Sequence, residues 1–97
     1  MEFVQIIEMR TKKFDEIETL EEEWRQATEG TRTLRRAVVA RDRNDPDRHL
    51  VLAFFDSYDE AMTNSNLPAT GEFGQKMAEF LDAPPVFHDL DVLSDRS

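Results

Sequence analysis

Residues 41–61 read RDRNDPDRHLVLAFFDSYDEA, and this stretch decides the fold class. It starts with a charged strand end and continues into NDPD at positions 44–47, where proline, Asn and Asp favour a turn. The run from His49 to Asp56 is apolar on both faces, which predicts a strand inside a covered sheet. Ser57 follows as a helix N-cap, with Glu60 at capping-box spacing. We therefore expect strand, turn, strand and helix in this order.

The flanking segments repeat the alternation of strand and helix. Residues 3–10 are β-rich and apolar on both faces, which favours a central strand. Residues 13–29 carry apolar side chains at spacings of three and four, the pattern of an amphipathic helix, and Gly30 follows as a typical helix end. The other predicted elements are a strand at 34–43, a short helix after Ser57 that breaks at 64–68, a helical piece at 70–81 and a last strand at 86–93.

This order predicts an α+β fold of the ferredoxin-like βαββαβ type. Such a fold has a four-stranded antiparallel sheet in the order 4-1-3-2, with the helices on one face. The first and third predicted strands are apolar on both faces and suit the centre of the sheet. The second and fourth carry charged residues and suit its edges, because charge on an edge strand resists aggregation. The uncovered sheet face would expose apolar residues, so we expect a homodimer in which two sheets pack into an α/β barrel. The predicted domain spans residues 1–93, and residues 94–97 form a polar tail.

Composition narrows the classes of partner. The formal net charge is −9, with 12 Lys and Arg against 21 Asp and Glu, so no nucleic-acid partner is expected. The chain has no cysteine, which excludes disulfides, thiolate metal sites and a cysteine nucleophile. No apolar run approaches the roughly 20 residues of a membrane helix, and the N-terminus lacks a signal-peptide pattern. We expect no membrane partner and a cytoplasmic location.

Several segments together carry a family resemblance. They are Asp45-Pro46, the apolar third strand, FDSYDEA at 55–61, NSNLP at 64–68 and PPVFHDLDV at 84–92. Nearly the whole chain thereby resembles the dimeric α/β-barrel superfamily, and within it the antibiotic-biosynthesis-monooxygenase-like proteins. The resemblance implies an apolar pocket and a cofactor-independent monooxygenase acting on a quinol-like or polycyclic aromatic. The alternatives are a non-enzymatic small-molecule-binding or structural dimer without the family's catalytic residues, and an acid–base isomerase or cyclase.

Cofactors are not expected. The resemblance implies that haem-degrading members use a histidine on the second helix, and this chain has Asn64 in that stretch. The ligand for a haem iron is therefore missing. The two histidines, His49 and His88, lie on different strands, and no spacing brings them together into a metal site. His49 is expected to be an exposed turn residue.

The candidate catalytic residues are His88 and Asn64. His88 alternates with Val86 and Leu90, so it points to the same face as they do, either as a proton acceptor or donor or as a core histidine. Asn64 and Asn66 lie where the second helix breaks, a place that edges the cavity in the family the chain resembles. Asparagine also suits such breaks for backbone reasons alone. Trp24, Tyr58 and Phe54 complete the predicted ligand-binding set, with core packing as the alternative for Trp24 and surface packing as the alternative for Tyr58.

Overall fold

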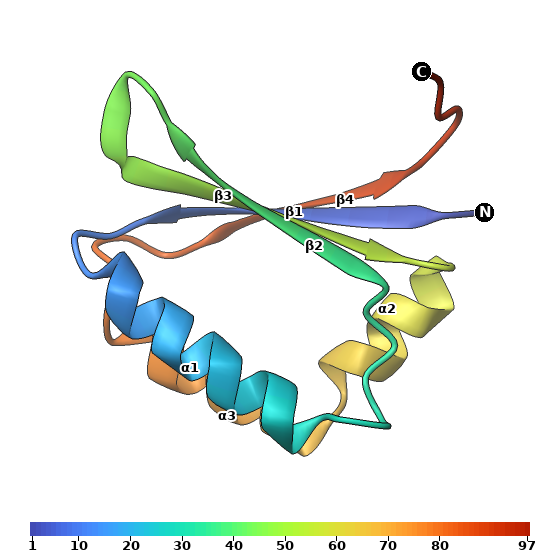
Figure 1. The fold of residues 1–97 in the computed structure, drawn as a ribbon, viewed down its shortest axis with the longest axis horizontal. Helices are drawn as coiled ribbons and strands as arrows, with labels where there is room; N and C mark the ends of the chain where they lie inside the picture. The colour runs from blue at the N-terminus through green and yellow to red at the C-terminus, as the bar shows by residue number, and fades with distance from the viewer.

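A computed structural model describes all 97 residues, and it consists of one sheet with helices on one side (Figure 1). The strands lie in the order β2-β3-β1-β4, and each neighbouring pair is antiparallel. This is the predicted order, so the ferredoxin-like fold class is confirmed. The elements are β1 (Phe3–Arg10), α1 (Phe14–Ala27), β2 (Arg36–Asp42), β3 (Asp45–Phe55), α2 (Tyr58–Ser65), α3 (Pro68–Ala78) and β4 (Val86–Asp91).

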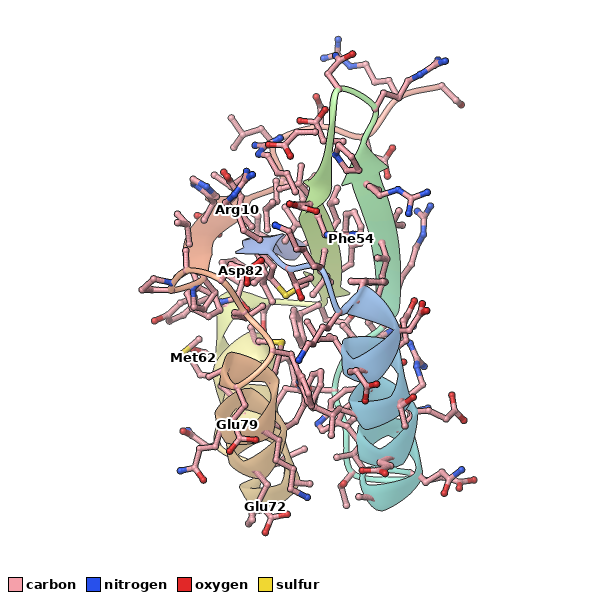
Figure 2. The ribbon with its side chains drawn as sticks, turned by 90° about the vertical axis from the view of Figure 1, so that its left-hand side faces the viewer. Arg10, Phe54, Met62, Glu72, Glu79 and Asp82 are labelled. Atoms are coloured by element: carbon pink, nitrogen blue, oxygen red, sulfur yellow. The ribbon has the colours of Figure 1, made fainter.

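Helices cover one face of the sheet and leave the other uncovered. Side chains alternate along a strand, and directly paired residues share a face. Phe3 and Phe55 pack against Ala61 of α2, and Met9 lies with Ile17 of α1 in a second cluster. Figure 2 shows α1 and α3 side by side beneath the strands. We call the opposite side, which no helix covers, the open face. Its apolar residues are Val4, Ile6, Val38, Leu50, Leu52, Phe54, Val86 and Leu90.

The turn between β2 and β3 is tighter than predicted. It consists of Arg43 and Asn44, and β3 already begins at Asp45 rather than at His49. Pro46 therefore lies inside a strand. It is tolerated there because the pairing shifts: Arg41 pairs with His49 and Asp42 with Asp45, which leaves residues 46–48 in a bulge. A bulge does not need the ladder hydrogen bond that proline cannot donate.

The second helix begins and breaks where the sequence predicts. The Ser57 hydroxyl accepts a hydrogen bond from the backbone N–H of Glu60 at 3.2 Å, which confirms the N-cap. α2 ends at Ser65, and α3 starts at Pro68, a residue suited to the first turn of a helix. Other boundaries move by a few residues, since the predicted elements at 13–29, 34–43, 70–81 and 86–93 are observed at 14–27, 36–42, 68–78 and 86–91.

The two ends of the chain emerge at the same end of the sheet (Figure 1). β1 and β4 pair from Phe3 opposite Asp91, and the backbone N–H of Val92 donates to the carbonyl of Glu2 at 2.9 Å. None of the three helices combines the length and apolar character needed to cross a bilayer.

Candidate functional site

His88 and Asn64 lie on opposite sides of the sheet. His88 pairs with Ile6, which places it on the open face together with Val86 and Leu90. Asn64 is on α2, on the helix side, and is only 6% exposed. The two predicted catalytic residues therefore cannot share a cavity within one chain. Alternation along β4 correctly groups His88 with its neighbours, but it does not tell which face the helices cover.

Asn64 already has a structural hydrogen bond. Its side-chain Oδ1 accepts from the backbone N–H of Thr33 at 3.2 Å, and the Thr33 hydroxyl donates to the carbonyl of Glu60 at 2.6 Å. These two bonds fasten the segment that precedes β2 onto α2. Asn66 is the exposed C-cap residue of α2. Neither asparagine lines either of the two cavities described below.

Trp24 packs between two helices. It is 7% exposed, and its indole Nε1 donates to the hydroxyl of Thr70 at 2.9 Å. Its ring lies against Phe73 of α3, with 6.2 Å between centroids. The adjoining cavity between α1 and α3 has a volume of about 100 Å³, far below the several hundred cubic ångströms typical of a ligand pocket. Trp24 is therefore a core residue that packs α1 against α3.

The two other predicted ligand-binding residues lie apart from Trp24 and from each other. Tyr58 is 50% exposed and places its ring edge-on to Phe3, with 5.4 Å between centroids. Phe54 is on the open face, where the guanidinium of Arg36 lies 5.5 Å from the centre of its ring. The structure does not bring the predicted site residues together.

The side chain that lies at a ligand-sized cleft is His49. It is on the helix side of β3 and only 4% exposed, and its ring stacks on Phe14 at 4.4 Å with an interplanar angle of 2°. The expectation of an exposed turn residue is wrong because β3 begins at Asp45, which places His49 within the sheet. Its Nδ1 lies 3.2 Å from the carbonyl oxygen of Asp47. A carbonyl can only accept, so this contact makes Nδ1 the donor, and in a neutral ring it leaves Nε2 as the acceptor.

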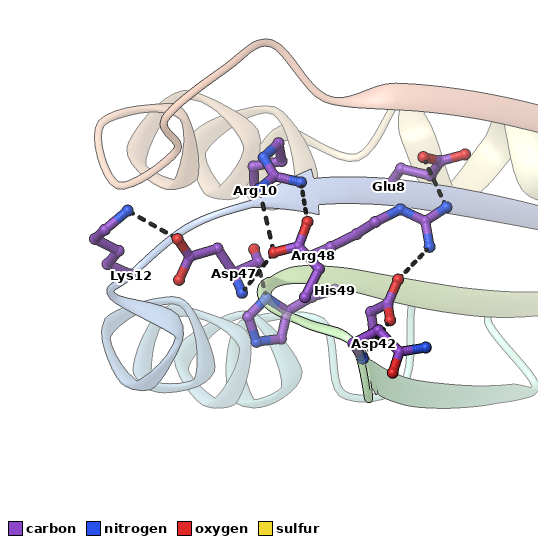
Figure 3. Close-up of polar contacts among 9 residues, drawn as sticks. Glu8, Arg10, Lys12, Asp42, Asp47, Arg48 and His49 are labelled. Atoms are coloured by element: carbon purple, nitrogen blue, oxygen red, sulfur yellow. Dashed lines mark hydrogen bonds and ion pairs between the residues drawn. The ribbon is translucent and has the colours of Figure 1, made fainter.

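The cleft lies where β1 passes into α1, beside the β2–β3 hairpin. Its volume is about 600 Å³, within the range of small-molecule sites. Lys12 bridges one side through its ammonium to Asp47 at 2.8 Å (Figure 3), and this contact raises the pKa of Lys12. The N-cap of α1, Lys13, provides no side-chain cap. Most of the lining residues are polar or charged, so the expectation of an apolar pocket is wrong for this cleft. The lining residues are Thr11, Lys12, Lys13, Phe14, Asp15, Glu16, Arg41, Pro46, Asp47, His49 and Phe80.

A second polar feature crosses the open face, and we call it the charge line: Asp42, Arg48, Glu8 and His88. Arg48 donates to Asp42 Oδ2 at 3.1 Å and to Glu8 Oε2 at 3.2 Å (Figure 3). His88 Nε2 lies 2.8 Å from Glu8 Oε1. The hydrogen bond from His88, followed by that from Arg48, lowers the pKa of Glu8. One residue of the charge line comes from each of the four strands. No group of three or more His, Cys, Asp and Glu side chains is arranged to hold a metal ion.

Fold and site together define a small ferredoxin-like α+β protein with one cleft on the helix side of its sheet. Solved structures share this fold across nearly their full length. A candidate antibiotic biosynthesis monooxygenase from Caulobacter crescentus matches with a TM-score of 0.82 and 14% identity, covering 96% of this chain and 91% of its own. One from Chloroflexus aurantiacus matches with a TM-score of 0.75 and 18% identity, covering 100% and 98%.

One of the matched structures is of an oxygenase. A variant of SnoaB, a cofactor-independent oxygenase from Streptomyces nogalater, matches with a TM-score of 0.81 and 9% identity over 97% of this chain and 95% of its own. No family model matches the sequence, and no curated protein does. At such identities the likeness shows the antibiotic-biosynthesis-monooxygenase fold alone.

Proposed function

We propose that this protein is a homodimer whose His49 cleft binds a small aromatic with an ionisable hydroxyl and oxidises it as a cofactor-independent monooxygenase. The observation that carries the proposal is the buried imidazole of His49, stacked on Phe14 at the wall of a cleft of about 600 Å³. The shared fold with a cofactor-independent oxygenase supports the same class of chemistry.

The reaction first requires a proton acceptor. A phenol reacts slowly with oxygen, whereas its anion is electron-rich, so loss of the hydroxyl proton starts the reaction. Nε2 of His49 would take that proton, while its Nδ1–H stays bonded to the carbonyl of Asp47. Lys13 and Arg41 line the same cleft and would stabilise the anion.

The overall reaction balances without an added reductant. One oxygen atom of O₂ enters the ring carbon para to the hydroxyl, and the other leaves as water. The phenol becomes a quinone and supplies all four electrons that reduce O₂, two for the oxygen atom that enters the ring and two for the one that leaves as water. The protein's part is to remove the proton and to hold the ring in place.

The homodimer is proposed from the open face. Val86 and Leu90 are 50% and 45% exposed, and they lie beside Ile6, Leu52 and Phe54 on a sheet surface that no helix covers. An exposed apolar surface of this kind usually marks an interaction site. A second copy packed sheet to sheet would bury it and close the barrel that the family resemblance implies.

A non-enzymatic binding or structural dimer is the second candidate. It is favoured by Asn64, whose side-chain oxygen is occupied by the backbone N–H of Thr33. Without that amide, His49 is the only imidazole on the helix side, since the other histidine lies on the open face. A cleft with one such group can bind a phenol without oxidising it.

The test uses 1-naphthol under air, with oxygen uptake and naphthoquinone absorbance as readouts, against a protein-free control. We expect turnover by the wild type without added metal or flavin, loss of turnover in His49→Gln, and retention in His88→Gln. Circular dichroism verifies that both variants fold. Binding of 1-naphthol in calorimetry without oxygen uptake would select the second candidate. If 1-naphthol does not bind and no oxygen is taken up, both candidate functions are contradicted.

A further inference from the structure

The charge line is unbalanced unless His88 is protonated. It contains two carboxylates, Asp42 and Glu8, and one guanidinium, Arg48, all joined by hydrogen bonds. Their sum is −2 + 1 = −1 with a neutral His88, and 0 when His88 carries a proton. Because a carboxylate only accepts, Nε2 of His88 donates to Glu8 in either state, and Nδ1 is where the extra proton binds.

His88 lies in the middle of the apolar part of β4. Val86, His88 and Leu90 alternate along the strand and share the open face, and the two apolar residues are about half exposed. A partner that covers Val86 and Leu90 must also cover the imidazole between them. In a twofold interface the same patch is present on both sides, so each copy brings its own charge line.

We infer that the pairing of two copies through the open face is linked to protonation of His88, so that the dimer tightens as the pH falls. This rests on the proposed homodimer. Covering the line with a neutral His88 would bury an uncompensated negative charge on each side, which is costly in a poorly hydrated interface. Protonation removes that excess charge from both copies.

The charged groups around His88 are already paired with one another. Glu8 faces it from β1, and the hydrogen bonds from His88 and Arg48 hold the pKa of Glu8 below its ordinary value, so Glu8 stays charged where histidine titrates. On β4, Asp89 and Asp91 pair with helix-side residues of β1, and Asp89 accepts from Gln5. The nearby Arg10 of β1 pairs with Asp45 at 2.7 Å, and this pair is neutral as a whole.

The sign follows from linkage. If the dimer binds more protons than two separate chains, the association constant rises as the pH is lowered. Uptake of one to two protons per dimer would lower the dissociation constant by about tenfold or more between roughly pH 8 and pH 5.5, the range in which histidine changes charge. Side-chain carboxylates remain mostly ionised over this range.

The experiment is sedimentation equilibrium at constant ionic strength across that pH range. We expect the tightening in the wild type and in His49→Gln, which removes the only other histidine and leaves the open face unchanged. His88→Gln should pair weakly at every pH. His88→Lys, with a permanent charge beside Glu8, should pair tightly at every pH. Circular dichroism verifies the fold of each variant.

The outcomes separate this inference from the homodimer itself. A dimer whose dissociation constant does not change with pH overturns the inference and leaves the homodimer standing. The same result follows if His88→Gln keeps the wild-type pH dependence, because the titrating group is then another one. A chain that is monomeric at every pH and concentration overturns both.

Discussion

Val51 and Leu52 are neighbours on β3 that point to opposite faces, so an aspartate at each position should produce two different failures. Val51 packs on the helix side against the cluster of Met9, Ile17 and Met77. Leu52 lies on the open face between Ile6 of β1 and Val38 of β2. We expect Val51→Asp to destabilise the single chain and Leu52→Asp to break pairing while the chain stays folded.

The magnitudes can be worked from the two environments. Val51→Asp forfeits about 1.5–2 kcal/mol of apolar burial, and a polar group without a partner costs about 1–3 kcal/mol more. A domain of this size has a free energy of unfolding of roughly 5–15 kcal/mol, so the loss is a large share of it. Leu52→Asp removes up to about 2 kcal/mol of burial from each copy, about 4 kcal/mol per dimer, which weakens association by about 10³-fold.

Two measurements distinguish these effects. Sedimentation velocity over a range of micromolar concentrations gives the oligomeric state, and urea unfolding followed by circular dichroism gives the stability. Leu52→Asn is the control for Leu52→Asp, since the asparagine side chain is similar in size to aspartate but carries no charge. The face assignment would be refuted by a Leu52→Asp protein that pairs like the wild type, or by a Val51→Asp protein with an unchanged urea midpoint.

Three further changes test local contacts. Ser57→Ala removes the N-cap of α2 and should lower the free energy of unfolding by about 1 kcal/mol in urea titrations. Glu8 has a lowered pKa, so its contribution is present above the ordinary value of 4.5 and is lost as the pH falls through the folded pKa; thermal midpoints of Glu8→Gln should lack this part of the acid-side decline. Thr70→Val removes the acceptor of the Trp24 indole and should cost about 1 kcal/mol and shift the fluorescence of the single tryptophan.

Periodicity and turn chemistry were sufficient to predict the elements and the strand order. The apolar spacing between residues 13 and 29 fits only a helix. The Ser57 cap and the break at residues 64–68 indicate where α2 begins and ends. The central place of β1 and β3 follows from their being apolar on both faces. These features depend on local sequence, so they can be predicted from one sequence alone.

The candidate site depends on information that alternation does not contain. Alternation groups His88 with Val86 and Leu90, yet only the packing of the helices decides that this group faces away from Asn64. His49 was misplaced because Pro46 suggested a turn, whereas a bulge lets the strand include it. Pro46 within a bulge and the apolar run that follows were the available signals for His49.

The meeting of the two chain ends has a practical consequence. Glu2 and Val92 are joined by a backbone hydrogen bond. The chain ends lie at one end of the sheet and the β2–β3 hairpin lies at the other (Figure 1). The His49 cleft is lined by residues of that hairpin. A fluorescent tag or surface tether on either end is therefore held away from the cleft. A short linker between the ends would also allow a circular permutant, with new ends opened between α2 and α3, that keeps every strand of the sheet intact.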